Sequence, residues 1–299
     1  MDLADLRIFK AVAEEGGITR AAARLNRVQS NITTRVKQLE AKLGTALFVR
    51  ENRRMKLSAE GKVLLSYADQ LLRLSAEAEA ALRDGAPRGT LKLGTMESTA
   101  AVRLPALLSR YHVAFPQVRL QLFTATSGAL INKLVAYEVE AAFVATPFAG
   151  DGLESMPAFE ETLVLIAPRG FRKIARPRDV TGATVIAFGA GCTYRRCLEE
   201  WLARERIVPA QVMEFASYHT IVACVAAGTG VAIVPQSVLQ AVAGGSEVAT
   251  YPLPGNGAKS ETHLVWRRGY RSSALDALRE ALQRKAKPKR AASANLSAK

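Results

Sequence analysis

The sequence predicts an α+β chain of several domains: a small helical module, one long helix, and a region of two α/β lobes. Three observations favour this fold class. Short helical patterns fill about the first sixty residues, a heptad pattern follows, and strand-like and helix-like segments alternate beyond residue 89. At roughly 100–200 residues per domain, 299 residues suffice for two or three such parts.

The first two predicted helices are short and follow each other closely. Leu6, Phe9 and Val12 recur at helical spacing, which predicts a helix that ends at Gly16. The second helix, ITRAAARL, follows at once, and Thr19 is its expected N-cap residue.

A third helix is predicted with one buried stripe, because Ile32, Val36, Leu39 and Leu43 are spaced i, i+4, i+7 and i+11. Gly44 is expected to end this helix. The tight turn between the second and third helices gives a helix-turn-helix pattern.

The opposite face of the third helix is polar and positively charged. Its short side chains can approach base edges and phosphates without keeping the helix out of a DNA groove. An ordinary solvated face is the alternative, but the basic flanks, the tight turn and the polar face together favour DNA. The residues on or beside this face are Arg27, Ser30, Asn31, Thr34, Lys37, Gln38 and Ala41.

The segment ALFVRENRRMKLS predicts two short strands around a turn at Glu51–Arg54. Such a hairpin would form a basic wing beside the DNA backbone. Arg50, Arg53 and Arg54 are expected to contact phosphates there, and contacts of that kind add affinity more than specificity.

Ser58 is the expected cap of a long helix from Ala59 to Arg83. An apolar seam three heptads long predicts a dimerisation helix, and packing against its own domain is the alternative. Heptad position a holds Leu64, Leu71 and Ala78, and position d holds Tyr67, Leu74 and Ala81.

Beyond the linker RDGAPRG, strands and helices alternate in a way typical of parallel βαβ units in two lobes. Ligands are expected at the carboxyl ends of the strands.

The tail KAKPKRAASANLSAK has few large apolar residues, which is typical of a disordered segment, and a solubilising role is favoured over a DNA clamp. The expected domains are 1–58 (winged helix-turn-helix), 59–86 (linker helix and hinge), 87–290 (effector-binding, with lobe I about 88–161 and 265–285 and lobe II about 162–264) and 286–299 (basic tail).

The net charge of +14 favours polyanionic partners, nucleic acid first and an anionic membrane surface second. Residues 20–62 alone hold eleven basic residues against three acidic ones. No apolar run reaches the roughly 18–20 residues of a membrane span, and the first residues do not look like a secretory signal. Three sparse cysteines fit a reducing cytoplasm, and three scattered histidines give no metal-ligand spacing, so neither metal nor cofactor is expected.

The segments AAARL, QSNITTRVKQLEAKLG, LFVR and LSAEGK resemble, in order and spacing, the DNA-binding module of LysR-type transcriptional regulators. LKLGTMEST, LPALLSRYHVAFPQVRLQL and AAGTGVAIVP resemble, more loosely, the family's effector domain, which has a periplasmic-binding-protein-like fold. The resemblance leaves out only about the last fifteen residues. One departure is Val28, where the family usually has Ser or Thr; valine cannot cap, so Asn26 or Ser30 is expected to begin the third helix.

The resemblance implies a DNA-binding dimer or tetramer that often represses its own gene and activates a neighbouring operon. RNA polymerase is a further partner to consider. A small co-inducer between the lobes would change how the DNA is bent. Matched residue by residue, the DNA-contacting stretch is Gln29, Ser30, Asn31, Thr33, Thr34 and Arg35. The effector site matches Thr95–Thr99, Thr126–Gly128, Ala145–Thr146, Gly191–Arg195 and Tyr218–Thr220.

Residue chemistry supports an effector site at the same segments. Small hydroxyls lie at strand ends that open helices, and helix N-termini favour a carboxylate or another small anion, such as an organic acid or amino acid. Each hydroxyl is equally well explained as a simple N-cap. Tyr194 and Arg195 are candidates for closing on the anion. The expected effector residues are Thr95, Ser98, Thr99, Ser127, Gly128, Thr146, Cys192, Thr193, Tyr194, Arg195, His219 and Thr220.

Three other functions are less consistent with the sequence. An enzyme with Cys192 as nucleophile and His219 as base lacks any pattern that brings the two together, so no catalysis is expected. A solute-binding module leaves the N-terminal part unexplained. A thiol-based redox sensor of the same family is the strongest rival, although Cys192 and Cys197 lie five residues apart and not on one helical face. Cys224 lies in an apolar helix and is expected in the core.

Overall fold

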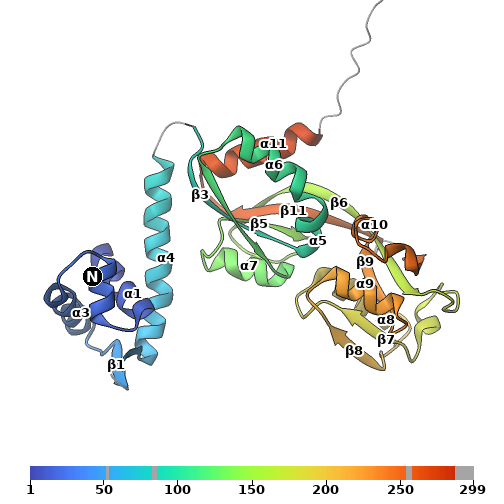
Figure 1. Cartoon of the computed structure of the whole chain (residues 1–299), viewed down its shortest axis with the longest axis horizontal. Helices are drawn as coiled ribbons and strands as arrows, with labels where there is room; N and C mark the ends of the chain where they lie inside the picture. Colours follow the sequence, from blue (N-terminus) through green and yellow to red (C-terminus); the bar gives the residue numbers. More distant parts are fainter. Residues whose placement is uncertain (52–53, 83–85, 254–257, 287–299) are drawn as a thin grey trace, which may run out of the picture. The chain divides into compact units, whose positions relative to one another are not determined.

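The computed structural model divides the chain into two compact units, Met1–Asp84 and Gly85–Lys299, which are described separately (Figure 1). It describes residues 1–51, 54–82, 86–253 and 258–286. No helix among them is long and apolar enough to cross a membrane.

The first unit is a helix-turn-helix module with a hairpin and a long helix. Its apolar core is formed mainly by α1 and α3, with Phe9 and Ile32 fully buried. Gly16 and Gly44 adopt left-handed backbone conformations and end these two helices as predicted. The elements are α1 (Leu3–Glu15), α2 (Ile18–Arg24), α3 (Gln29–Leu43), β1 (Phe48–Glu51), β2 (Arg54–Leu57) and α4 (Ala59–Ala81).

The helix starts differ from the sequence prediction. Thr19 does not cap α2, because the helix begins two residues earlier than such a cap requires, at Ile18, and Gly17 takes the N-cap position. Val28 is the N-cap of α3, with an extended backbone and no side-chain hydrogen bond. Neither Asn26 nor Ser30 replaces it: Asn26 has a positive φ of 51° in the preceding turn, and Ser30 lies inside the first helical turn.

The buried stripe of α3 is shorter than predicted. Ile32, Val36 and Leu39 are buried, whereas Leu43 is exposed at the last helical position. A side chain at a helix end has fewer neighbours to cover it. The stripe therefore fixes the first two thirds of α3 on the core.

β1 and β2 form the predicted antiparallel hairpin, with Phe48 opposite Leu57. Lys56 forms an ion pair with Glu51 at 2.6 Å, across the hairpin. The tip, which includes Arg53, lies outside the described residues. For Arg50 and Arg54 the structure describes the strand backbone and not the side chains.

α4 has two apolar faces. Its start is capped as predicted, because the Ser58 hydroxyl accepts a hydrogen bond from the Gly61 backbone N–H at 2.8 Å. One face packs on the unit's core and includes the fully buried Ala68. The second face carries four side chains that are 39–59% exposed, namely Val63, Tyr67, Leu71 and Leu74. Of the predicted seam, Leu64 packs on the core of its own unit, whereas Tyr67, Leu71 and Leu74 are left uncovered.

The second unit has two lobes. Lobe I contains β3 (Gly89–Thr95), α5 (Glu97–Val102), α6 (Leu104–Ala114), β4 (Val118–Thr124), α7 (Ser127–Val135), β5 (Ala141–Ala145), β11 (Lys259–Arg267) and α11 (Ser273–Ala286). Lobe II contains η1 (Pro177–Val180), β7 (Thr184–Ala187), α8 (Thr193–Ala203), β8 (Gln211–Glu214), α9 (Tyr218–Ala226), β9 (Ala232–Pro235), α10 (Gln236–Ala241), η2 (Gly245–Glu247) and β10 (Val248–Pro252). β6 (Leu153–Pro168) belongs to both lobes.

The predicted parallel βαβ units are present in both lobes. β3 pairs in parallel with β4 and β5, and β7 pairs in parallel with β8. In lobe I, α6 and α11 cover one face of the sheet and α7 covers the other (Figure 1). The carboxyl ends of β3 and β4, followed directly by α5 and α7, therefore lie at one edge of the sheet.

One strand connects the two lobes. Up to Thr162, β6 pairs with β11 in the sheet of lobe I, and from Leu163 it pairs with β9 and β10 of lobe II. β11 enters the lobe I sheet at Lys259, earlier than the predicted lobe boundary at residue 265. The sequence prediction missed this because the strand begins with polar residues.

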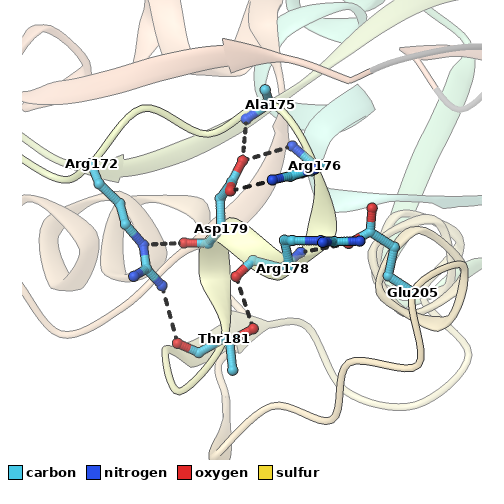
Figure 2. A network of polar contacts seen from close by, with 7 residues as sticks. All are labelled: Arg172, Ala175, Arg176, Arg178, Asp179, Thr181 and Glu205. Atoms are coloured by element: carbon cyan, nitrogen blue, oxygen red, sulfur yellow. Dashed lines mark hydrogen bonds and ion pairs between the residues drawn. The ribbon is translucent and has the colours of Figure 1, made fainter.

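A polar network fixes the η1 segment on lobe II (Figure 2). The Asp179 carboxylate accepts hydrogen bonds from the backbone N–H groups of Ala175 (2.9 Å) and Arg176 (3.0 Å), and these bonds lower its pKa. Arg178 forms an ion pair with Glu205 at 2.9 Å. This pair ties η1 to the turn after α8, the helix whose first turn belongs to the candidate site.

Candidate functional site

The outer face of α3 is the first candidate site. Most of the predicted DNA-contacting side chains lie exposed there or beside it, namely Arg27, Gln29, Ser30, Asn31, Thr34, Lys37 and Gln38. Thr33 is half-buried, and its hydroxyl donates to the Gln29 backbone carbonyl at 2.9 Å. Val28, at the start of the helix, is 68% exposed, so an apolar side chain also lies at this surface.

Arg35 is placed differently from its predicted role. Its guanidinium forms ion pairs with Asp5 at 2.9 Å and with Asp2 at 3.7 Å. Both carboxylates belong to the start of α1, so Arg35 ties α3 to α1. A phosphate would have to compete with two carboxylates for this cation.

The second candidate site is a small cavity between the lobes of the second unit. Its volume is about 20 Å³, room for roughly one water molecule. Lobe I contributes Met96–Ser98 and Ala125–Ser127, and lobe II contributes Phe188, Cys192–Tyr194 and Tyr218. The cavity thus lies where β3, β4 and β7 end and α5, α7, α8 and α9 begin.

Three polar atoms at this cavity are buried without a partner at hydrogen-bonding geometry: Glu97 Oε2, Ser98 Oγ and the Tyr194 hydroxyl. The Ser98 hydroxyl nevertheless lies against the phenols of Tyr194 and Tyr218. Ser98 and Tyr194 are only 4% and 3% exposed. The hydroxyl of Thr262 is buried and unpartnered as well, and it lies against the Tyr194 phenol. Each unpartnered buried polar group costs about 1–3 kcal/mol, so a group of them is typical of a ligand site rather than of a finished core.

Burial also changes the ionisation of these groups. It raises the pKa of the Glu97 carboxyl, against the opposing effects of the Tyr218 backbone amide and the nearby His219. It likewise raises the pKa of the Tyr194 and Tyr218 hydroxyls, which stay protonated at neutral pH. Glu97 is the acidic residue among those that line the cavity, and one of its two carboxyl oxygens has no hydrogen-bond donor from the protein.

The two lobes touch beside the cavity through their backbones. The Gly128 N–H donates to the Gly191 carbonyl at 3.2 Å, which joins the start of α7 to the loop before α8. Gly191 has a φ of 84°, and a Cβ there would lie 3.1 Å from the Thr126 hydroxyl oxygen. Across the same boundary, Arg196 donates to the Pro147 carbonyl at 3.2 Å. These contacts hold the two lobes together beside the cavity.

Five predicted effector residues line the cavity: Ser98, Ser127, Cys192, Thr193 and Tyr194. Among these, the Ser127 hydroxyl is already bonded, since it accepts from the Ala145 N–H at 3.1 Å. The other predicted residues of lobe I lie close by without lining it, and they are Thr95, Thr99, Gly128 and Thr146. Thr95 and Thr99 are buried, Gly128 takes part in the lobe contact, and the Thr146 N–H bonds to β11.

Arg195, His219 and Thr220 are not brought to the cavity wall. Arg195 is engaged by Glu199 at 2.7 Å and by Glu214, and the closing of its guanidinium on an anion stays a prediction. His219 and Thr220 are exposed on α9. The helix begins at Tyr218, and the helical turn points the next two side chains outward.

Sequence reasoning missed Glu97, Phe188 and Tyr218 as single residues. Glu97 and Tyr218 lie inside segments that the family resemblance assigns to the effector site. The prediction named the hydroxyl and imidazole residues beside them instead, because such groups are common ligand contacts. Phe188 ends a strand and packs on Tyr218, with ring centroids 4.6 Å apart. A large aromatic residue directly before a glycine-rich loop was the available signal.

The cysteines do not form a redox pair in this structure. Cys192 and Cys197 are both free and partly buried, and burial raises the pKa of both thiols. A raised pKa lowers the thiolate fraction on which peroxide and disulfide chemistry depend. Cys224 packs against the core, and no cluster of three potential metal ligands occurs within the described parts of the chain.

Comparison with known proteins covers both units. Residues 3–62 match the family described as "Bacterial regulatory helix-turn-helix protein, lysR family", and residues 84–287 match "LysR substrate binding domain". The uncharacterized HTH-type transcriptional regulator YusT of Bacillus subtilis is 40% identical over 277 residues, 92% of this chain and 93% of the relative. The regulator GltR of the same organism is 37% identical over 80% of this chain and 81% of its own length.

Solved structures of full-length regulators have the same fold. OxyR from Pseudomonas aeruginosa superimposes with a TM-score of 0.70 at 23% identity, covering 95% of both chains. CbnR in complex with its target DNA gives a TM-score of 0.67 at 24% identity, covering 95% of this chain and 99% of CbnR.

Proposed function

Because the chain belongs to the LysR family of transcriptional regulators, we propose that α3 reads operator DNA and that a small effector between the lobes alters this binding. The unpartnered buried polar atoms at the cavity carry the effector part of the proposal. The relatives that the chain matches are regulators, and we assign no catalytic step to it.

For DNA, the support is the exposed polar face of α3. Thr34 and Lys37 lie outward, opposite the buried Ile32 and Val36, so the face that would enter a major groove is free of core contacts. The excess of basic residues around α3 attracts phosphates without regard to sequence. Site-specific recognition then depends on the short polar side chains.

For the effector, the support is a pair of helix starts. The N-cap residues of α7 and α8, Thr126 and Cys192, make no side-chain capping hydrogen bond, and both residues line the cavity. Backbone N–H groups at such helix starts attract an anionic group. We therefore propose a small effector with a carboxylate, an organic acid or an amino acid. A cavity of about 20 Å³ requires the lobes to separate as it binds.

The exposed apolar face of α4 supports assembly. Tyr67, Leu71 and Leu74 would be covered by the same face of a second copy, in a dimer or as part of a tetramer. A two-fold dimer places two α3 helices on two half-sites of one operator. We place the protein in the cytoplasm, where a regulator has access to DNA. RNA polymerase is a further proposed partner, because an activator commonly contacts it.

The DNA assignment is tested by Thr34→Ala. We expect discrimination between operator and random DNA to fall by roughly three- to tenfold, because one side-chain contact to a base edge is lost. Thr229→Ala, which changes an exposed threonine of lobe II, is the matched control. Fluorescence anisotropy at fixed salt measures both affinities. Unchanged discrimination would show that α3 is not the reading helix.

The effector assignment is tested by a thermal-shift screen of organic acids and amino acids on the full chain. A compound that raises the melting temperature should also change operator affinity. We expect Ser98→Ala to weaken that response, because Ser98 is buried at the cavity. A response that is insensitive to Ser98 would place the effector elsewhere.

A further inference from the structure

We propose that the effector carries an amino group and that Glu97 binds this group as an ammonium. The inference rests on the proposed function, since it concerns the same cavity. It narrows the effector class from small acids in general to amino acids and closely related amino-carboxylates.

The first support is the charge of the cavity wall. Among the residues that line it, Glu97 carries an acidic side chain and none is a lysine or arginine. One carboxylate oxygen of Glu97 is buried without a partner. A carboxylate in such a position needs hydrogen-bond donors, and an ammonium group brings three of them together with the opposite charge.

The second support is that the nearby protein cations are already engaged. Arg195 is paired with Glu199 and Glu214, and it also donates to the Phe188 carbonyl at 3.2 Å, so its guanidinium is already engaged. Arg103, in the same lobe as Glu97, pairs with Glu161 at 2.6 Å.

His219 is the remaining basic group near Glu97. It lies close enough to lower the pKa of the Glu97 carboxyl, but its own position on α9 is exposed. It does not line the cavity, and none of the residues that do is a lysine or arginine that could pair with Glu97.

The third support is the aromatic character of the wall. Phe188 and Tyr218 form a tilted ring pair at the cavity, and Tyr194 lies there as well. Aromatic rings attract cations through their electron-rich faces. The hydroxyls of Ser98 and Tyr194 lie against each other without a formed hydrogen bond, and their oxygens are further acceptors for ammonium protons. The wall around Glu97 thus offers acceptors and aromatic rings, which suit a cation.

The two ends of an amino acid match two parts of the cavity. The carboxylate end fits the starts of α7 and α8, which no side chain caps, although the Gly128 N–H of α7 already donates to the Gly191 carbonyl. The ammonium end fits Glu97 at the start of α5. The Tyr218 backbone amide of lobe II also lies at the Glu97 carboxylate. A ligand held at both ends would therefore contact both lobes.

The experiment uses pairs of compounds that differ only in the amino group: L-alanine and propionate, L-aspartate and succinate, L-glutamate and glutarate, L-phenylalanine and 3-phenylpropionate. The full-length protein is screened with each by thermal shift, and calorimetry then gives Kd. We expect an amino acid to bind at least about tenfold tighter than its deaminated partner, because a largely desolvated ion pair is lost without the amine.

Two variants test whether Glu97 causes the preference for the amino acid over its deaminated partner. Glu97→Gln keeps the size of the side chain and removes its charge, so the advantage of the amino acid should disappear. Glu160→Gln removes one charge from an exposed glutamate of lobe I and should leave the advantage intact. The melting temperature of each variant without ligand shows that it is folded.

The possible failures are distinguishable. If the deaminated acids bind as tightly as the amino acids, or if Glu97→Gln keeps the preference, the ammonium assignment is wrong. If Ser98→Ala still weakens binding of those acids, the effector site itself stands. If no compound of either kind shifts the melting temperature or changes operator affinity, both proposals fall.

Discussion

Burial sets the chemistry of Cys192. A thiol beside an arginine and at a helix start would ordinarily be a candidate for activation. Here burial outweighs the opposing effects of the Arg195 and Tyr194 backbone amides, and the pKa of the thiol is raised. The thiol lines the cavity, and its raised pKa leaves less thiolate at neutral pH than a free cysteine has.

The pH dependence of alkylation checks this conclusion. A raised pKa means less thiolate at neutral pH, so iodoacetamide should modify Cys192 more slowly than free cysteine. The rate should still be rising above pH 9, the usual pKa of a thiol. Mass spectrometry follows the peptide, and Cys192→Ser confirms its assignment. Alkylation that is already at its plateau near pH 7 would restore the redox interpretation.

Single residues were the least predictable part of the site. The sequence marks where strands end and helices begin, and three residues predicted there, Ser98, Thr193 and Tyr194, line the cavity. The sequence does not reveal which ion pair a side chain forms. Arg195 on α8 pairs with Glu199 of the same helix and with Glu214 of β8. The pair with Glu214 depends on how β8 packs beside α8, which only the folded structure shows.

At the scale of elements, α4 shows how one helix serves two apolar surfaces. Leu64 and Ala68 belong to the core of the first unit, whereas Leu71 and Leu74 are uncovered. The heptad pattern predicted a single seam and could not separate these roles. The heptad periodicity identifies the apolar positions of α4. Which of these positions are buried depends on the side of α4 against which α1 packs.

The uncovered face should hold copies of the chain together. The double variant Leu71→Asp, Leu74→Asp places two charges in the proposed seam, and we expect dissociation constants to rise by roughly a hundredfold or more, since each buried large apolar side chain contributes about 1.5–3 kcal/mol. Sedimentation velocity measures the change. Ala76→Asp, on an exposed position outside the seam, should leave assembly unchanged. An assembly that survives the double variant would assign dimerisation to another surface.

Most elements were predictable because their signals are local. Apolar spacing, Gly16 and Gly44 specified α1 and α3 almost to the residue. Helix starts failed where backbone geometry replaced a side-chain cap, as at Gly17 and Val28. Capping rules name the preferred residue, but a helix can also begin at an extended residue that offers no side-chain bond.

At the scale of the whole molecule, the division at Asp84 and Gly85 separates the apolar cores. One cluster belongs entirely to the first unit and two belong entirely to the second. Each unit therefore has the apolar interior that independent folding requires.

The second unit should accordingly fold by itself. We expect residues 88–299 to give a cooperative thermal transition and to keep the melting shift caused by whichever compound stabilises the full chain. The fragment should not bind operator DNA, because α3 is missing. Calorimetry and anisotropy check the two statements. A fragment that is unfolded, as judged by near-ultraviolet circular dichroism, would show that the units stabilise each other.

The strand shared by the two lobes has a mechanical consequence. β6 is hydrogen-bonded to β11 along its first part and between β9 and β10 along its last part, so neither half is free to pivot like a loop. Any rotation of one lobe against the other must twist this ladder near Thr162 and Leu163. If an effector binds between the lobes as proposed, its binding energy has to bend this hydrogen-bonded strand, and the strand should return to its original twist when the effector leaves.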